Sequence, residues 1–279
     1  GHPGQDRSAS RAVIVRSATT ITAGALDAAP ALLVIGRAGI GVDNIDVGRA
    51  TERGIVVLNT PDANATTTAE LTLAHILSLS RSLPQADRSL RAGEWKRSQF
   101  MGAELANKTL GIVGYGTIGR IVAAMARALR MRVIAHDPFV TPQAFEADGI
   151  ECMDLDALIA VADYLTLHCP MNNKTRGLLN GERLRSMKRG ARIINCARGG
   201  LVDEPALHDL LASGHLGGAA LDVFEQEPPG DSPLLKLDNV VATPHLGAST
   251  HEAQEAAGRE IARQVVAFLN DGEPINAIN

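Results

Sequence analysis

The chain has 279 residues, a formal net charge of −4, 45% hydrophobic residues and 21% charged residues. This length and composition favour a globular protein of two domains, and an aromatic content of only 3% favours cores of Ala, Val, Ile and Leu, as in buried parallel sheets. The sequence has no run of five or more basic residues and no stretch of about 18 apolar residues, which excludes an evident nucleic-acid surface or membrane span.

The first part of the chain alternates short apolar runs with helical patterns. Residues 1–11 are polar and aperiodic, which predicts a disordered tail. Strands are predicted at residues 12–15, 32–35 and 55–58, with helices at residues 23–29 and 45–53 between them. This alternation predicts a parallel sheet.

A longer helix is predicted over residues 66–82. Thr68 and its neighbours are candidates to cap it, and Glu70 falls in its first turn. Its broad apolar face indicates a helix that connects the first part of the chain to a second unit. Residues 84–107 are polar and contain the only tryptophan, Trp95.

The second part begins with another alternation of strands and helices. Strands are predicted at residues 109–113, 132–136, 164–169, 192–196, 218–221 and 240–242. Helices are predicted at about residues 118–130 and 252–270. The whole pattern predicts an α/β protein with parallel sheets.

A glycine-rich loop follows the predicted strand at residues 109–113 and opens the next helix. It reads Gly114-Tyr115-Gly116-Thr117-Ile118-Gly119. The first glycine permits a tight turn, the second lets the backbone approach a pyrophosphate, and the third lets helix and strand pack closely. The helix N-terminus offers N–H groups to phosphates, so the loop predicts a dinucleotide site.

Asp137 ends the next predicted strand, 18 residues after Gly119. A carboxylate at that position can accept hydrogen bonds from ribose hydroxyls and would repel a 2′-phosphate. Pro138 and Phe139 follow it and supply no arginine to offset that repulsion. The sequence therefore predicts NAD rather than NADP. The alternative is that Asp137 only shapes the turn before Pro138.

Three residues further along fit one reaction on a 2-oxo or 2-hydroxy acid. His245 is the candidate acid/base, because histidine has a reference pKa of about 6.5. His75 and His168, on a helix and within a predicted strand, are interpreted as structural. Arg198, at a strand end, suits a substrate carboxylate. A glutamate partner would hold the His245 ring, and composition leaves Glu225 and Glu227 both open.

Four segments carry a family resemblance that extends from about Ala12 to the end of the chain. They are residues 37–44, 195–203, 220–224 and 244–250, and they resemble the D-isomer-specific 2-hydroxyacid dehydrogenases. The resemblance implies that Arg198 binds substrate, that His245 is the acid/base and that Glu227, which directly precedes Pro228, is its partner. The spacings of 29 and 18 residues between the three match the family.

The resemblance also assigns residues around the reacting groups. For the cofactor it implies Asp222 beside the nicotinamide, and also Gly114, Gly116, Thr117, Ile118, Gly119, Asp137, Cys169, Cys196, Ala197, Gly247 and Ala248. For the substrate it implies Arg16 and Arg37, while the backbone of Gly39 and Gly41 is predicted to hold a carboxylate in a nest. Lys96 and Arg97 are candidates to reach the site of a neighbouring subunit. The alternative is that they form only a solvated basic patch.

The fold implied by the resemblance has two Rossmann-like or flavodoxin-like parallel-sheet domains. A discontinuous substrate domain would contain residues 1–61 and 248–279, and an NAD-binding domain residues 62–247. Substrate would bind in a cleft that closes by hinge motion. The family's first strand and helix are not found before Ala12, so we expect an exposed apolar sheet edge. Whether the chain is a complete enzyme or a fragment stays open at this point.

The function implied by the resemblance is NAD-dependent oxidation of D-3-phosphoglycerate to 3-phosphohydroxypyruvate, the entry to serine synthesis. The alternatives are a glyoxylate, hydroxypyruvate or D-lactate reductase, an NAD-sensing corepressor, and an inactive fragment. We expect a small-molecule substrate, no nucleic-acid or membrane partner, and a homodimer or tetramer. Three cysteines that fit no zinc pattern predict reduced thiols, no metal and a cytoplasmic protein.

Overall fold

The computed structural model describes residues 10–279, so nearly all of the predicted tail at residues 1–11 lies outside the described residues. Internal contacts divide the chain into two units. Unit 1 contains the residues up to Thr67 together with Ala248–Asn279, and unit 2 is Thr68–Gly247. The predicted division at residues 61 and 62 lies a few residues earlier, because the connecting helix begins at Ala65 and its first residues belong to unit 1.

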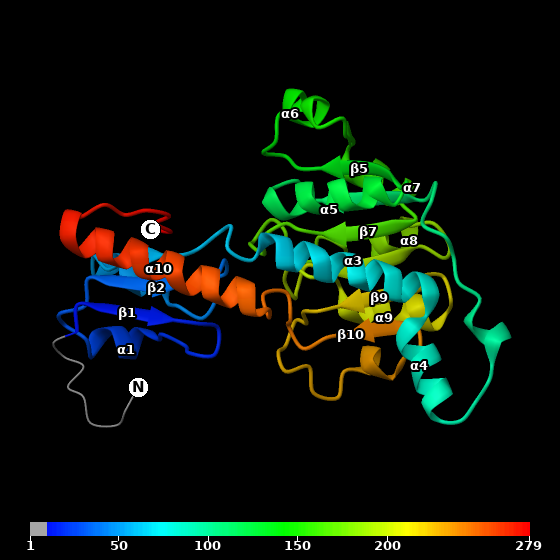
Figure 1. The fold of residues 1–279 in the computed structure, drawn as a ribbon, viewed down its shortest axis with the longest axis horizontal. Coiled ribbons are helices and arrows are strands. Elements are labelled where there is room, and N and C mark those ends of the chain that lie inside the picture. Colours follow the sequence, from blue (N-terminus) through cyan, green and yellow to red (C-terminus); the bar gives the residue numbers. More distant parts are fainter. Residues whose placement is uncertain (1–9) are drawn as a thin grey trace. The chain divides into compact units, whose positions relative to one another are not determined.

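Unit 1 is built on a three-stranded parallel sheet with the order β1-β2-β3 (Figure 1). The elements are β1 (Ala12–Val15), α1 (Ala23–Asp27), β2 (Val34–Arg37), α2 (Val47–Glu52), β3 (Val56–Leu58) and α10 (His251–Asp271). Strand β2 lies two residues later than the predicted 32–35, because its ladder with β1 begins at the pair Ala12 and Val34. The alternation of strands and helices confirms the predicted β-α-β pattern.

Helix α10 packs closely on the central strand of unit 1. A Cβ on Gly36 would lie 2.7 Å from Ile261 and 2.8 Å from Val265, so only glycine permits this approach. Thr250 caps the helix by accepting the Ala253 N–H, and Gly272 ends it in the left-handed region at φ 73°. The last helix therefore returns the chain to the sheet of its first part.

Unit 2 contains a seven-stranded parallel sheet with the order β10-β9-β8-β7-β4-β5-β6. Its strands are β4 (Thr109–Val113), β5 (Arg132–His136), β6 (Glu151–Cys152), β7 (Tyr164–Leu167), β8 (Arg192–Asn195), β9 (Gly218–Leu221) and β10 (Val240–Ala242). All residues of β4, β7 and β9 are buried, which explains why these strands read as continuous apolar runs. His168, predicted inside a strand, lies just beyond β7.

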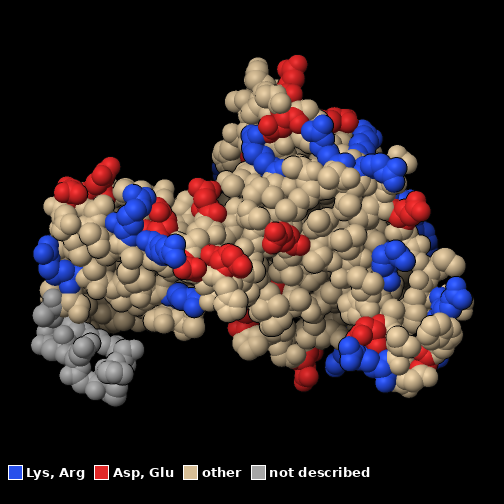
Figure 2. Space-filling view, viewed as in Figure 1, with Lys and Arg blue, Asp and Glu red and all other residues tan. Residues whose placement is uncertain are grey.

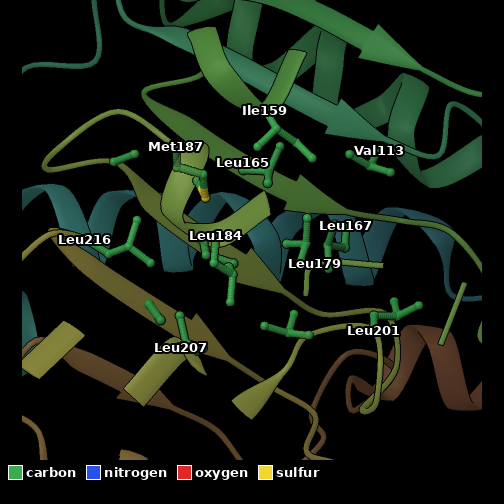
Figure 3. Packing of buried hydrophobic residues seen from close by; sticks show 14 of the residues in the cluster. Val113, Ile159, Leu165, Leu167, Leu179, Leu184, Met187, Leu201, Leu207 and Leu216 are labelled. Atoms are coloured by element: carbon green, nitrogen blue, oxygen red, sulfur yellow. The ribbon is translucent and has the colours of Figure 1, made fainter. Parts of the chain in front are cut away.

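Helices cover both faces of this sheet. They are α3 (Ala65–Arg81), α5 (Thr117–Ala128), α6 (Pro142–Ala147), α7 (Leu155–Val161), α8 (Gly181–Ser186) and α9 (Glu204–Ala212). The unit also contains helix α4 (Leu83–Arg91) and 3₁₀ turns at Arg97–Phe100 and Pro233–Lys236. One core contains side chains of α3, α5 and α6. The other, shown in Figure 3, packs Ile159, Leu184 and Leu207 of α7, α8 and α9 against Leu165 and Leu167.

Two local predictions need correction. Helix α3 begins at Ala65, so Thr68 lies within it and does not cap it; its hydroxyl instead donates to Gly247 O. Residues 83–91, nearly all of them in the stretch 84–107 read only as polar, form helix α4, which has no buried residue and begins with proline in its first turn. Its apolar residues, Leu83, Ala86 and Leu90, recur at helical spacing, but they are few within a mostly polar segment.

The surface agrees with the modest net charge. On the face shown in Figure 2, basic and acidic side chains are interspersed, with no broad field of one sign. Among residues 10–279, no helix is both long and apolar enough to cross a bilayer.

The strand order of unit 2 reverses between β4 and β7. At such a reversal the loops after neighbouring strands leave on opposite faces, and a crevice opens at the carboxyl ends of the strands. The loops after β4 and β7 begin with Gly114 and His168, so the topology places the glycine-rich loop at this point.

Candidate active site

The glycine-rich loop after β4 has three glycines in three different environments. A Cβ on Gly114 (φ 96°) would lie 2.6 Å from the backbone of His168 and Cys169, and one on Gly119 would lie 2.3 Å from Gly114 O. A Cβ on Gly116 would meet nothing within 4 Å. The first and third glycines therefore serve the fold, while the second faces open space.

That open space lies at the N-terminus of α5, where backbone N–H groups point outward. Gly116 is the N-cap residue and makes no side-chain cap, and both Gly116 and Thr117 are exposed, while Ile118 is partly buried. A pyrophosphate needs a backbone surface without a side chain and N–H donors beside it. The residues present therefore fit the dinucleotide that the sequence predicts.

Asp137 follows β5 and joins the glycine loop to the next turn. Its Oδ2 accepts the Tyr115 N–H at 2.8 Å and its Oδ1 accepts the Phe139 N–H at 2.9 Å. A carboxylate has about four acceptor positions, so both oxygens keep capacity for ribose hydroxyls. The structural role of Asp137 is thus observed, and its role in cofactor binding stays a prediction.

Cys169, Cys196 and Ala197 lie at the carboxyl ends of β7 and β8. Burial raises the pKa of the Cys169 thiol to about 11 and that of Cys196 to about 12, with contributions in the same direction from the charges of Asp137 and Asp222. Neutral thiols are poor nucleophiles and poor metal ligands. These positions can therefore line a cofactor site without adding reactivity of their own.

Arg198 is held in a turn that its own sequence neighbours build. The buried side chain of Asn195 donates from Nδ2 to Arg198 O at 2.8 Å and accepts the Ala197 N–H at 3.1 Å. The Arg198 guanidinium, which is partly buried, donates from Nη1 to Ala197 O. Gly199 comes next, and a Cβ there would lie 1.8 Å from Phe224 O. The Arg198 turn therefore lies directly against the segment that follows β9.

Glu227 and His245 form a hydrogen-bonded pair. Glu227 Oε2 lies 2.7 Å from His245 Nδ1, and Glu227 Oε1 accepts the Phe224 N–H at 3.2 Å. The side chains are 38% and 49% exposed, so the imidazole remains accessible to a ligand. Because the carboxylate accepts at Nδ1, Nε2 is the nitrogen left for a substrate.

The other candidate glutamate, Glu225, makes its observed contact through its backbone. The Glu225 N–H is donated to Glu204 Oε1 at 2.7 Å, which fixes the start of the 225–229 segment to helix α9. Burial, with the charge of Glu225, raises the pKa of Glu204. The structure therefore pairs His245 with Glu227, as the resemblance implies, where composition alone left both glutamates open.

Asp222 lies beneath the segment that carries His245. It is fully buried, and its carboxylate accepts the Thr243 hydroxyl at 2.5 Å, the Leu246 N–H at 2.7 Å and the Gly247 N–H at 2.8 Å. Its backbone oxygen accepts the His245 N–H at 2.9 Å. The structure thus shows Asp222 as the anchor of residues 243–247, and its place beside the nicotinamide stays a prediction. Ala248 is the first residue of the second segment of unit 1.

The two histidines interpreted as structural differ in their surroundings. His168 Nε2 bonds Thr166 Oγ1 at 3.0 Å, its Nδ1 is buried without a hydrogen-bond partner among the described residues, and burial lowers its pKa to about 4. His75 is 3% exposed, and its Nε2 lies 3.1 Å from Thr243 Oγ1. His75 therefore contacts Thr243, whose hydroxyl donates to the anchor Asp222.

The predicted substrate residues belong to unit 1. Arg16 is exposed after β1, and Arg37 ends β2 and donates from Nη1 to Ala38 O. Gly39 has φ 138° and gives its N–H to Thr60 Oγ1 at 2.8 Å, so the predicted carboxylate nest would depend on the next N–H groups, including that of Gly41. These assignments stay predictions.

Residues that sequence reasoning missed act on the backbone of the site. Asn195, Gly199 and Thr243 build its turns, and Thr68 and His75 reach it from α3. An asparagine at a strand end before a turn is a recognisable signal for a side chain that bonds its own backbone. The contacts of Thr68 and His75 have no local signal, because their partners lie far away in the sequence.

Comparison with known proteins places the chain among dehydrogenases. The family described as D-isomer specific 2-hydroxyacid dehydrogenase, NAD binding domain, matches residues 73–247. D-3-phosphoglycerate dehydrogenase of Methanocaldococcus jannaschii is 49% identical over 268 residues, which cover 96% of this chain and 51% of that protein. The Mycobacterium leprae protein of that name is 52% identical over 254 residues, covering 91% and 48%. The chain therefore spans about half the length of the curated relatives it matches.

Solved structures of similar proteins give the same picture. The TT0316 protein from Thermus thermophilus is 39% identical with a TM-score of 0.88, over 95% of this chain and 85% of that chain. A D-lactate dehydrogenase from Aquifex aeolicus, complexed with NAD and lactic acid, is 31% identical with a TM-score of 0.88, over 98% and 87%. The family match, the relatives and the parallel-sheet fold agree: the chain belongs to the D-isomer specific 2-hydroxyacid dehydrogenase family, and residues 73–247 match its NAD-binding domain.

Proposed function

We propose that this chain catalyses the NAD-dependent oxidation of D-3-phosphoglycerate to 3-phosphohydroxypyruvate. The observation that carries the proposal is the contact between Glu227 and His245, 2.7 Å apart, on a segment anchored by buried Asp222. The turn of Arg198 lies against the segment that precedes Glu227. An imidazole oriented by a carboxylate, with a guanidinium nearby, suits proton transfer on a carboxylate-bearing substrate.

In this mechanism His245 is the acid/base. Its Nδ1 faces Glu227, so Nε2 takes the proton of the substrate hydroxyl during oxidation and returns it during reduction. Glu227 holds the ring in that orientation and stabilises its positive charge when the proton has been taken. Arg198 binds the substrate carboxylate through its guanidinium fork, which fixes the reacting carbon.

The cofactor would bind on the loop from Gly114 to Gly119, with the open position at Gly116 receiving its phosphates and Asp137 its adenosine ribose. NAD, when bound, supplies the acceptor for the hydride. The negative charge of Asp137 disfavours a 2′-phosphate at the ribose, which supports NAD over NADP.

The phosphorylated substrate is supported by the two relatives named D-3-phosphoglycerate dehydrogenase that are 49% and 52% identical. Arg16 and Arg37 of unit 1 are the further cationic side chains proposed for this substrate. The backbone around Gly39 and Gly41 is proposed to donate to its carboxylate. Association into a homodimer or tetramer also stays a prediction, and light scattering after size-exclusion chromatography tests it.

The test is a substrate panel on the chain of 279 residues, with NADH absorbance as the readout. D-3-phosphoglycerate and D-glycerate form a matched pair that differs only in the phosphate. We expect a kcat/KM at least about 10²-fold higher for the phosphorylated acid, because several charge-assisted hydrogen bonds are lost without it. Equal rates for the two acids would contradict the assignment.

A rival within the family is a reductase of smaller 2-oxo acids. It is favoured by similar structures named glyoxylate reductase, 33% identical, and D-lactate dehydrogenase, 31% identical. Faster turnover of glyoxylate, hydroxypyruvate or pyruvate than of 3-phosphohydroxypyruvate would select this rival. Tight NADH binding without turnover of any acid would instead favour a cofactor-sensing protein.

A further inference from the structure

We propose that His75 is a positioning residue for the reaction, and that it acts through Thr243 and Asp222 on the segment that presents His245. The inference rests on the proposed function, because it assigns His245 the acid/base role. It concerns unit 2 alone, in which helix α3 runs beside the end of β10 and the 243–247 segment.

Helix α3 contacts this segment at both of its ends. His75 Nε2 lies 3.1 Å from Thr243 Oγ1, and the Thr68 hydroxyl donates to Gly247 O at 2.9 Å. Residues seven apart lie on the same face of a helix, so the two contacts come from one stripe of α3. In the sequence, His245 lies between Thr243 and Gly247, the two residues that this face of α3 contacts.

The direction of the hydrogen bonds follows from the donors present. The Thr243 hydroxyl has a single proton and donates it to Asp222 Oδ1 at 2.5 Å. Thr243 Oγ1 can therefore only accept from His75, which must carry its proton on Nε2. Burial lowers the pKa of His75, while the charge of Asp222 opposes that shift, so the neutral ring with Nε2–H is the form that fits.

This chain of hydrogen bonds ends on the backbone of the acid/base. Asp222 accepts the Leu246 and Gly247 N–H groups with its side chain and the His245 N–H with its backbone oxygen. His245 is held at φ 54°, a left-handed conformation that a residue with a side chain rarely adopts unless its surroundings impose it. The donor on His75 keeps the Thr243 hydroxyl aimed at Asp222 and so supports that conformation.

The experiment compares His75→Leu, which removes the donor, with His75→Gln, whose side-chain amide can donate from a similar reach. With D-3-phosphoglycerate and NAD we expect kcat to fall about 10-fold in His75→Leu, because small misplacements of a reacting group cost this much or more. KM for the acid should change less than about 2-fold. His75→Gln should recover most of the lost kcat.

Thr243→Val tests the same link from the other side. If the two residues act in series, the double variant His75→Leu/Thr243→Val should have nearly the kcat of the slower single variant, not the product of the two losses. Hydrogen exchange adds a readout without turnover, because the amides of Leu246 and Gly247 should exchange at least about 10-fold faster in His75→Leu while NADH binding is kept.

The proposal is overturned if His75→Leu keeps wild-type kcat and wild-type exchange at Leu246 and Gly247, or if His75→Gln is as slow as His75→Leu. Multiplying losses in the double variant would also overturn it. Absence of turnover in the wild-type chain would count against the proposed function, and the exchange rates would still decide whether His75 orders the segment.

Discussion

Two carboxylates hold the His245 segment, and they do so in opposite environments. Glu227 is 38% exposed and meets the imidazole itself at 2.7 Å. Asp222 is fully buried and meets the backbone and Thr243 through three donors. Water competes for the first contact and not for the second, so Glu227 should govern the chemistry with little effect on stability, whereas Asp222 should govern both.

The largest expected effect is that of removing the buried carboxylate. Asp222→Ala leaves the Thr243 hydroxyl and the Leu246 and Gly247 N–H groups without their acceptor, and each unpaired buried donor costs about 1–3 kcal/mol. We expect the free energy of unfolding in urea to fall by at least about 3 kcal/mol, with activity lost. A loss below about 1 kcal/mol would show that the contrast between the two carboxylates is wrong.

Removing the exposed carboxylate should separate activity from stability. In Glu227→Gln we expect kcat to fall about 10²-fold, which corresponds to about 2.7 kcal/mol of transition-state stabilisation, while the free energy of unfolding changes by less than about 1 kcal/mol. Glu225→Gln is the matched control, because its N–H and not its carboxylate makes the observed contact. A similar fall in kcat in both variants would contradict a specific role for Glu227.

The buried imidazole of His168 should make stability depend on acid pH. Its pKa falls from 6.5 to about 4 in the folded chain, so the unfolded chain binds more protons between these values. Stability is therefore retained above pH about 6.5 and is lost as the pH falls toward 4, by about 3 kcal/mol. Urea unfolding of wild type and His168→Gln at several pH values measures this dependence. An equally steep loss of unfolding free energy in the variant would show that other groups cause it.

The smallest effect should come from the glycine that faces open space. Gly116→Ala adds a Cβ that meets no atom of the chain, at φ −80°, so the unfolding free energy should change by less than about 0.5 kcal/mol. The methyl group enters the space proposed for the pyrophosphate, and we expect the Kd for NADH to rise about 10-fold. Gly119→Ala, whose Cβ would lie 2.3 Å from Gly114 O, should lose stability as well. Unchanged NADH affinity in Gly116→Ala would contradict the proposal that the cofactor binds at this loop.

The parts of the site that could be predicted are those whose signal is local. The glycine loop is recognisable because each of its glycines meets a separate local requirement of the motif. The strands of unit 2 are recognisable because buried parallel strands are continuous apolar runs. The choice between Glu225 and Glu227 was not available from composition, because it depends on which side chain turns toward a histidine 18 residues further on. It required the resemblance and then the geometry.

His75 shows why the rest could not be predicted. Its interpretation as a structural residue agrees with a side chain that is 3% exposed. Its partner, Thr243, is 168 residues away, and no periodicity within α3 points to that contact. Helix α4 is missed although Leu83, Ala86 and Leu90 recur at helical spacing, because the segment is mostly polar and none of its residues is buried.

The most direct test of the account is the kcat/KM for NADH formation from D-3-phosphoglycerate by the wild-type chain and by His245→Asn, with NADH binding measured for both. General acid/base catalysis contributes about 10²–10⁴-fold, so the account predicts turnover by the wild type and a loss of that size in the variant with unchanged NADH affinity. Wild-type turnover in His245→Asn would contradict the account.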